Sequence, residues 1–170
     1  MSPTKSNHIT DLIEGVDYIL EGGSCRVGIE STIISLVGTP TILRKGRITK
    51  EEIESVIGSV TVNINSSSKP EAPGMLEKHY APTTKLEIYD NNKEYSGNIA
   101  FIAFGDNTPN IKLSSVVNLS EDSDYIEAGE NLYSALRDLD KENFDLILTS
   151  YIPEISIGQA INDKLKRASA

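Results

Sequence analysis

The chain has 170 residues, enough for one ordinary domain or two small ones. Its 25 acidic and 16 basic side chains give a net charge of −9, which argues against a protein that grips nucleic acid through a broad basic face. A hydrophobic fraction of 38% with 24% charged residues is typical of a globular chain rather than a disordered one. No apolar run approaches the ~18 residues of a membrane span, and the single cysteine excludes an internal disulfide.

The N-terminal residues and the distribution of charge add two expectations. Residues 1–4 lack the charged-then-apolar pattern of a signal sequence, so we expect a cytoplasmic location and no membrane association. Residues 1–85 carry a net charge of −1, whereas residues 86–170 carry −8. This asymmetry suggests two units with different roles, of which the first tolerates an anionic small molecule better.

The first half of the chain predicts short elements. Thr4 offers a hydroxyl cap and the apolar residues after it have helical spacing, so we expect a helix over residues 4–12. The apolar residues 18–20 precede a Gly-Gly turn and predict a short strand. Two runs rich in β-branched residues, 31–37 and 41–44, predict a hairpin.

The next segment predicts one helix and one strand. Thr49 and Glu52 have the spacing of a capping box, in which each side chain accepts a hydrogen bond from the other residue's backbone N–H. An apolar stripe follows, and Gly58 stands where a helix C-terminus often needs a positive φ. Residues 60–62 predict a last strand.

Residues 64–85 have the composition of a linker, because serine and proline are frequent. The segment nevertheless contains four side chains suited to packing or binding: Met75, Leu76, His79 and Tyr80. An inert spacer has little use for them, so we expect part of this segment to dock on another part of the molecule.

The second half alternates apolar strands with amphipathic helices. The predicted strands cover 86–89, 99–104, 115–119 and 144–149, and the predicted helices cover 125–140 and 158–167. Apolar strands separated by helices indicate a mainly parallel sheet covered on both faces. Neither half contains the glycine pattern of a dinucleotide-binding or Walker motif.

Two short segments carry polar side chains of chemical interest. Residues 28–32 place Ser31 and Thr32 at the mouth of a buried strand, where hydroxyls can bind a carboxylate or phosphate oxygen. Residues 43–47 cluster three cations around Gly46, which allows a backbone to approach a phosphate closely. Each has a structural alternative, hydrogen bonding within the sheet for the first and a solvated turn for the second, and spacing alone favours these alternatives.

The two histidines predict no metal site. His8 lies on a short polar helix, where we expect it at the surface, and His79 lies in the aromatic end of the linker. They are far apart in sequence and have no carboxylate or cysteine ligands at metal-binding spacing. A Ser-His-Asp triad is not supported, because no serine stands in a nucleophile-elbow context.

Taken together, these residues resemble a known family. Residues 2–4 (SPT), 22–34 with their GIEST block, and 42–46 (ILRKG) resemble the later part of a YrdC-like domain. Residues 73–82 (PGMLEKHYAP) look like the connector of the long, two-domain threonylcarbamoyl-AMP synthases, and 158–165 resemble the last helix of their second domain. The order of these blocks is a specific signal, and the resemblance runs from Ser2 to the C-terminus.

The resemblance implies a reaction and its participants. Such enzymes join L-threonine, bicarbonate and ATP into threonylcarbamoyl-AMP and release pyrophosphate, with Mg²⁺ accompanying the ATP. A threonine carbamate attacks the α-phosphorus, so cations and N–H donors should dominate the site. The product serves threonylcarbamoylation of an adenosine beside the tRNA anticodon, and tRNA is only an indirect partner.

The resemblance also assigns binding residues. It assigns L-threonine binding to Ser31 and Thr32. It assigns ATP binding to residues at the N-terminus, after the second predicted strand and in the linker: Ser2, Thr4, Arg44, His79 and Tyr80. In this arrangement residues 73–82 fold over the pocket and bring His79 and Tyr80 near Ser31 and Arg44. No residue is assigned a catalytic role, and no metal ligand is expected.

This chain departs from the family at its N-terminal side. Family members carry a K-x-R motif and an S-x-N motif upstream of the SPT segment, and this sequence has neither motif at that place; residues 45–47 read K-x-R but lie in the ILRKG position. We therefore expect an α/β chain with a partial YrdC-like portion at 1–63, a linker at 64–85 and a small Rossmann-like α/β/α domain at 86–170. A separate chain could supply the remaining part of the catalytic domain.

Two other functions stay open. A non-catalytic interaction or binding module derived from the enzyme is favoured by the missing cationic motif, whereas Ser31, Arg44 and the His79-Tyr80 pair favour synthase activity. A nucleotide-binding α/β protein unrelated to tRNA is the weakest alternative, because it ignores the ordered motifs.

Overall fold

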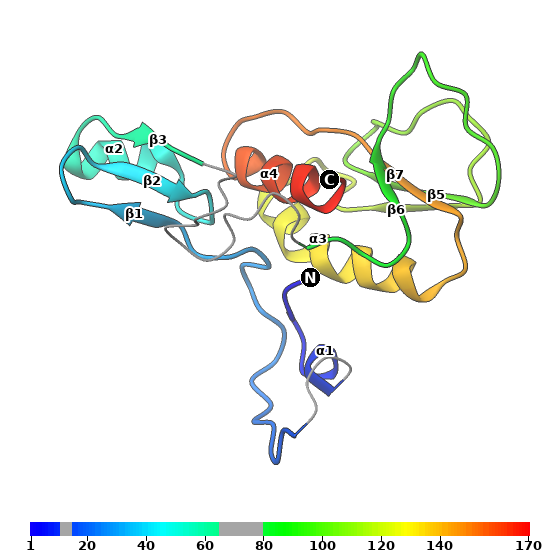
Figure 1. Ribbon diagram of the computed structural model, residues 1–170, viewed down its shortest axis with the longest axis horizontal. Coiled ribbons are helices and arrows are strands. Elements are labelled where there is room, and N and C mark those ends of the chain that lie inside the picture. Colours follow the sequence, from blue (N-terminus) through cyan, green and yellow to red (C-terminus); the bar gives the residue numbers. More distant parts are fainter. Residues whose placement is uncertain (11–14, 65–79) are drawn as a thin grey trace.

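The computed structural model describes residues 1–10, 15–64 and 80–170 (Figure 1). Its elements, in chain order, are α1 (Asn7–Thr10), β1 (Ile33–Ser35), β2 (Thr41–Arg44), α2 (Lys50–Ile57), β3 (Thr61–Val62), β4 (Leu86–Ile88), β5 (Ile99–Ala103), β6 (Ser115–Asn118), α3 (Tyr125–Lys141), β7 (Leu146–Thr149) and α4 (Gly158–Ala168). They form two sheets, one in each half of the chain.

The first sheet has the order β1-β2-β3. β1 and β2 form the predicted antiparallel hairpin, and β3 runs parallel to β2 after a crossover through α2. The capping box at the start of α2 is confirmed: the Thr49 backbone N–H donates to the Glu52 carboxylate at 2.7 Å, and the Glu52 N–H donates to the Thr49 hydroxyl at 3.2 Å. Gly58 ends α2 with the predicted positive φ of 80°.

The second sheet has the order β4-β7-β5-β6, and all its pairs are parallel, as predicted. Every residue of β5 is buried. Ala100 and Ile102 face a large core formed with α3 and α4, whereas Ile99 and Phe101 face a smaller cluster of loop and strand residues that includes Tyr95 and Leu113. Both faces are therefore covered, and among the described residues the helices cover only one of them.

The segment between α1 and β1 differs from the prediction. The described residues 18–20 form no strand; Tyr18 is 79% and Leu20 is 85% exposed. The apolar run predicted a strand, but no other strand of the described chain lies beside it to pair with its backbone. The expected helix over 4–12 is represented by α1 alone, and residues 11–14 lie outside the described residues.

In Figure 1, α4 lies between the two sheets, and α3 starts beside α4 and runs along one side of the second sheet. The N-terminal residues contact α3 directly, because Arg137 donates a hydrogen bond to the backbone carbonyl of Met1. Gly28, with a φ of 70°, passes so close to α3 that a Cβ atom there would overlap the backbone at Gly129 and Glu130. The first half of the chain is thus docked on the helices of the second half. No helix among the described residues is long and apolar enough to cross a bilayer.

Candidate functional site

The two polar segments singled out in the sequence meet in space. A Cβ atom on Gly46 would overlap the Glu30 carbonyl oxygen and the backbone of Ser31 and Thr32, so only glycine fits this contact. The Arg47 backbone N–H also donates to the Glu30 carbonyl at 3.2 Å. The sequence left two readings of residues 43–47, a phosphate contact and a solvated turn, and in the structure the backbone of the GIEST block lies against Gly46. We call residues 30–32 and 44–46 the motif corner.

Ser31 and Arg44 form the polar centre of the motif corner. The Arg44 guanidinium donates from Nε to the Ser31 carbonyl and from Nη2 to the Ser31 hydroxyl, both at 2.9 Å. Ser31 is exposed and Arg44 is half-buried, so the pair faces solvent. A guanidinium beside a hydroxyl, each held by the other, is an arrangement that binds carboxylate or phosphate oxygens.

Glu30, which precedes Ser31, collects hydroxyl groups from three distant parts of the chain. Tyr133 on α3 donates to both carboxylate oxygens at 3.0 Å, and Ser2 donates to one of them. Tyr80 shares a side-chain hydrogen bond with the same carboxylate. Glu30 therefore ties the N-terminus, α3 and Tyr80 of the predicted linker to the motif corner.

Tyr80 is buried between the motif corner and the C-terminal helices. Its ring centroid lies 5.5 Å from that of Tyr133, and the Lys164 ammonium lies 5.7 Å from its centroid. Burial and the negative charge of Glu30 raise the pKa of Tyr80 to about 12, while the positive charge of Arg44 lowers it. Tyr80 is therefore a neutral hydrogen-bond donor at physiological pH.

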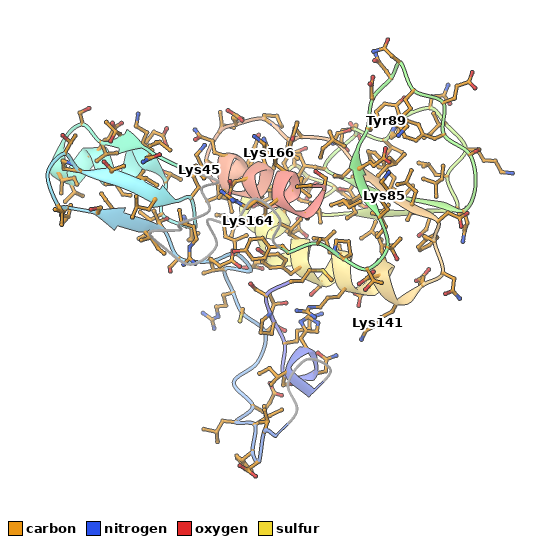
Figure 2. All side chains as sticks on the ribbon, viewed as in Figure 1. Lys45, Lys85, Tyr89, Lys141, Lys164 and Lys166 are labelled. Carbon is orange, nitrogen blue, oxygen red and sulfur yellow. The ribbon has the colours of Figure 1, made fainter. Side chains whose placement is uncertain are left out.

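Lys164 of α4 reaches the motif corner from the other side. Its side chain is fully buried, and its ammonium donates to the Lys45 carbonyl at 3.1 Å and to Asp163 Oδ2 at 3.0 Å. Figure 2 shows Lys45, Lys164 and Lys166 together where α4 approaches the first sheet, while Lys141 lies at the far end of α3. A lysine of the C-terminal helix thus holds the backbone directly after Arg44.

The other predicted site residues make different contacts. The Thr32 hydroxyl donates to the Ile48 carbonyl at 2.6 Å. Thr4 is buried, with its hydroxyl 3.4 Å from both His8 Nδ1 and the Ser134 hydroxyl, so it faces α1 and α3. His79 lies outside the described residues, as do residues 73–78 of the predicted docking segment.

His8 corrects a prediction. It was expected at the surface and is instead 4% exposed, and its Nδ1 accepts the Thr4 backbone N–H at 3.1 Å. Burial, followed by the positive charge of Arg137, lowers the pKa of His8 below its ordinary value. A short polar helix gave no indication of this burial or of an electrostatic influence from α3, more than 120 positions away.

Two cavities flank the motif corner. One is bounded by Thr32, Lys45, Gly46 and residues of α2 and α4. The other is an open cleft between Lys45 and the end of α4, with basic side chains from Lys166 and Arg167. Among the described residues no group of three acidic, histidine or cysteine side chains is arranged to hold a metal ion. Glu154 and Asp163 also line the cleft beside Lys45, and Asp163 is paired with Arg167, so side chains of both charges meet there.

Three residues of this arrangement were not predicted as site residues: Glu30, Tyr133 and Lys164. Glu30 stood in a recognised block and could have been singled out as an acid beside the binding serine. Tyr133 and Lys164 gave no such signal, because each occupies an ordinary position on an amphipathic helix. Their involvement depends on how the two halves dock.

Comparison with known proteins gives consistent results. The family model described as threonylcarbamoyl-AMP synthase, C-terminal domain, matches residues 48–170. The threonylcarbamoyl-AMP synthase of Bacillus subtilis is 32% identical over 184 residues, covering 99% of this chain and 53% of that protein. The enzyme of the same name from Pyrococcus abyssi is 31% identical, covering 99% of this chain and 54% of that protein.

Solved structures show the same relationship. The crystal structure of P. abyssi Sua5 complexed with L-threonine matches with a TM-score of 0.83 and 30% identity, covering 99% of this chain and 54% of that one. A P. abyssi Sua5 variant with an adjacent histidine and tyrosine both changed to alanine matches with a TM-score of 0.80 and 29% identity, covering 99% of this chain and 53% of that one. This chain spans about half the length of the curated relatives it matches. The resemblance drawn from the motifs is thus confirmed, and the chain belongs to the threonylcarbamoyl-AMP synthase family, whose C-terminal domain it contains.

Proposed function

We propose that this chain supplies the Ser31–Arg44 part of a threonylcarbamoyl-AMP synthase active site, which binds L-threonine and a phosphate of ATP. The observation that carries the proposal is the pair of 2.9 Å hydrogen bonds that join the Arg44 guanidinium to Ser31. They hold a cation and a hydroxyl side by side at the solvent-facing motif corner. A relative that shares the fold is solved in complex with L-threonine, which supports the choice of ligand.

The proposed reaction requires positive charge at the motif corner. In the proposed reaction bicarbonate and L-threonine form a carbamate, whose oxygen attacks the α-phosphorus of ATP, and pyrophosphate leaves. Negative charge accumulates on the phosphate oxygens, and Arg44 is suited to stabilise it. Mg²⁺ enters with ATP, bound by its phosphates. The product passes to the cytoplasmic enzymes that modify adenosine in tRNA, and the net charge of −9 fits a protein that does not itself hold tRNA.

A further polypeptide segment completes the site in this proposal. Among the described residues, ten of the thirteen exposed large hydrophobic side chains lie between positions 16 and 62, on the segment before β1, the first sheet and α2. Val37 is 91% exposed and Val56 is 82% exposed, whereas β5 of the second sheet is buried throughout. Exposed apolar side chains in this number are consistent with an interface in this part of the chain. The covering segment corresponds to the part of the relatives that this chain does not span.

Tyr80 and its neighbour connect the linker to the same site. The solved variant of P. abyssi Sua5 changes an adjacent histidine and tyrosine, and His79-Tyr80 is the one such pair in this sequence. Tyr80 donates a hydrogen bond to Glu30, and the positive charge of Arg44 lowers the pKa of its hydroxyl. In the proposal Tyr80 and Ser2 therefore support the ATP-binding side through Glu30, and His79 belongs to the same side.

The test is reconstitution. The purified 170-residue chain is assayed for ATP- and L-threonine-dependent pyrophosphate release, alone and mixed with the polypeptide covering the remaining length of the B. subtilis relative. We expect no release from the chain alone, because an active site without its principal cations loses on the order of 10²-fold in rate for each missing donor. We expect release on mixing, and Arg44→Ala should reduce it by about 10²-fold.

The control is Lys112→Ala, which removes an exposed cation of the second domain, outside the surface proposed to be covered, and should leave the reconstituted rate unchanged. Turnover by the chain alone would show that it needs no completing segment. Association of the two polypeptides without turnover, whether or not Arg44 is present, would favour the alternative, a non-catalytic interaction module.

A further inference from the structure

Both residues that flank the Ser31–Arg44 pair are held by side chains of the C-terminal helices. On one side, Tyr133 of α3 donates its hydroxyl to both oxygens of Glu30, at 3.0 Å each. On the other side, the Lys164 ammonium of α4 donates to the Lys45 carbonyl at 3.1 Å. The two contacts span 103 and 119 positions of sequence, so they form only when the two halves of the chain dock.

Neither contact is needed to build the second domain. Tyr133 and Lys164 are both buried, yet their polar atoms point out of the core of α3 and α4 toward the motif corner. A buried ammonium is costly unless its hydrogen bonds are made, and replacing a buried ion pair by apolar residues is often neutral or stabilising. A purely structural interface would be served as well by apolar side chains at both positions. The polar side chains instead orient two groups of the motif corner, the Glu30 carboxylate and the Lys45 carbonyl.

Tyr80 links the two contacts into one unit. Its ring lies between them, 5.5 Å from the Tyr133 ring and 5.7 Å from the Lys164 ammonium, and its hydroxyl joins the Glu30 carboxylate. The Lys164 ammonium also pairs with Asp163 Oδ2 at 3.0 Å, which keeps its charge compensated. Movement of either helix would therefore disturb both flanks of the Ser31–Arg44 pair together.

We propose that Tyr133 and Lys164 are positioning residues, which fix the backbone at Glu30 and Lys45 and thereby set the relative placement of Ser31 and Arg44. The inference rests on the proposed function in one respect, namely that Ser31 and Arg44 bind L-threonine. It gives the C-terminal domain a defined part in the reaction: its helices shape the substrate site without touching the substrate.

The experiment compares Tyr133→Phe and Lys164→Met with matched controls in the full chain. Tyr95→Phe removes a tyrosine hydroxyl that accepts the Asp90 N–H in the second domain, and Lys166→Met removes an exposed lysine two residues from Lys164. The first readout is amide hydrogen exchange of residues 30–46 in the ligand-free protein. The second is the dissociation constant for L-threonine, measured by calorimetry in the reconstituted mixture described above.

We expect faster exchange over residues 30–46 in Tyr133→Phe and Lys164→Met, with exchange in β5 and β7 unchanged. We expect L-threonine to bind about tenfold more weakly in each, the loss typical of one hydrogen bond to a charged group. Lys164→Arg keeps a buried donor and should recover most of the affinity. Both control variants should behave as the parent chain.

The outcomes separate the two ideas. Unchanged exchange over residues 30–46 in both Tyr133→Phe and Lys164→Met overturns the positioning role, whatever the ligand result. If the parent mixture does not bind L-threonine, the proposed function fails, and the exchange data alone decide whether the helices hold the motif corner. If Lys164→Met fails to fold, Tyr133→Phe carries the comparison, because it removes only a hydroxyl and retains the buried volume.

Discussion

His8 is held as a neutral imidazole. Its Nδ1 accepts the Thr4 backbone N–H at 3.1 Å, which requires that nitrogen to be unprotonated. Burial lowers the pKa of His8, and the positive charges of Arg137, Lys5 and Lys141 lower it further, while Asp138 on α3 acts in the opposite sense. A folded-state pKa below the unfolded value of about 6.5 means that the unfolded chain binds the proton more tightly.

The free energy of unfolding should therefore be highest above pH 6.5 and fall as the pH decreases through the lowered pKa of His8. His8→Asn keeps a side-chain acceptor near Thr4 but does not titrate, so its unfolding free energy should fall less between pH 7.5 and pH 5.5. Urea unfolding of the two proteins at both pH values measures the difference. Equal decreases in the parent chain and His8→Asn would contradict a buried neutral His8.

The residues of the motif corner differ in how far the sequence could identify them. Ser31 and Arg44 lie in short blocks of recognisable order, so their selection needed no knowledge of the fold. The contacts of Glu30 with Tyr133 and of Lys45 with Lys164 connect positions more than a hundred residues apart. Such contacts depend on the docking of two halves that each follow their own local pattern, and no periodicity or spacing encodes them.

At the scale of elements, Gly46 joins β2 to the GIEST block. A Cβ atom there would overlap the backbone of Glu30, Ser31 and Thr32, so the substitution forces β2 and this block apart. We expect Gly46→Ala to destabilise the protein by about 1–3 kcal/mol, the range for inserting a methyl group where no space exists. Thermal unfolding of the full chain measures this loss.

Gly22→Ala is the matched control for Gly46→Ala. Gly22 lies in the exposed segment before β1, and a Cβ atom there would have nothing within 4 Å. Its substitution should change stability by less than about 0.5 kcal/mol, as for most surface positions. Equal unfolding temperatures for Gly46→Ala and the parent chain would show that the close contact at Gly46 is absent in solution.

Elements whose local sequence pattern is complete were predicted correctly, whereas the strand expected at residues 18–20 was not, because it has no neighbouring strand to pair with. α2 carries its capping box and C-terminal glycine in the sequence, and the alternation of strands and helices after residue 85 indicated the parallel sheet. Residues 18–20 have the composition of a strand, but a strand forms only where a neighbouring strand accepts its backbone hydrogen bonds. The described chain provides none, and Tyr18 and Leu20 remain exposed.

At the scale of the molecule, the two sheets differ in the size of their cores. Among the described residues, the main core cluster has eighteen buried members within 86–170, together with Ile29 and Tyr80, whereas the buried hydrophobic side chains in and around β2 and β3 are Ile42, Leu43 and Val60. The area of apolar surface removed from water largely determines the stability of each part. The second domain should therefore hold its structure without the first, and the first depends on contacts with α3 and α4 and on the segment proposed to cover it.

Limited digestion with trypsin tests this difference. The serine-rich composition of residues 64–72 is that of a linker, and Lys78, within the predicted linker at 64–85, offers a trypsin site, whereas trypsin does not cleave the Lys69–Pro70 bond. We expect an early cut after Lys78, followed by loss of the N-terminal piece, because cleavage releases it from a covalent attachment that its small core cannot replace. A fragment that contains residues 86–170 should persist, and mass spectrometry of the time course identifies both pieces.

Both pieces contain further sites for trypsin, so the comparison does not depend on the number of sites. The N-terminal piece contains Arg44 and Arg47, and the C-terminal piece contains Arg137 and Arg167. Persistence of the N-terminal piece with digestion of residues 86–170 would reverse the assignment of the stable domain.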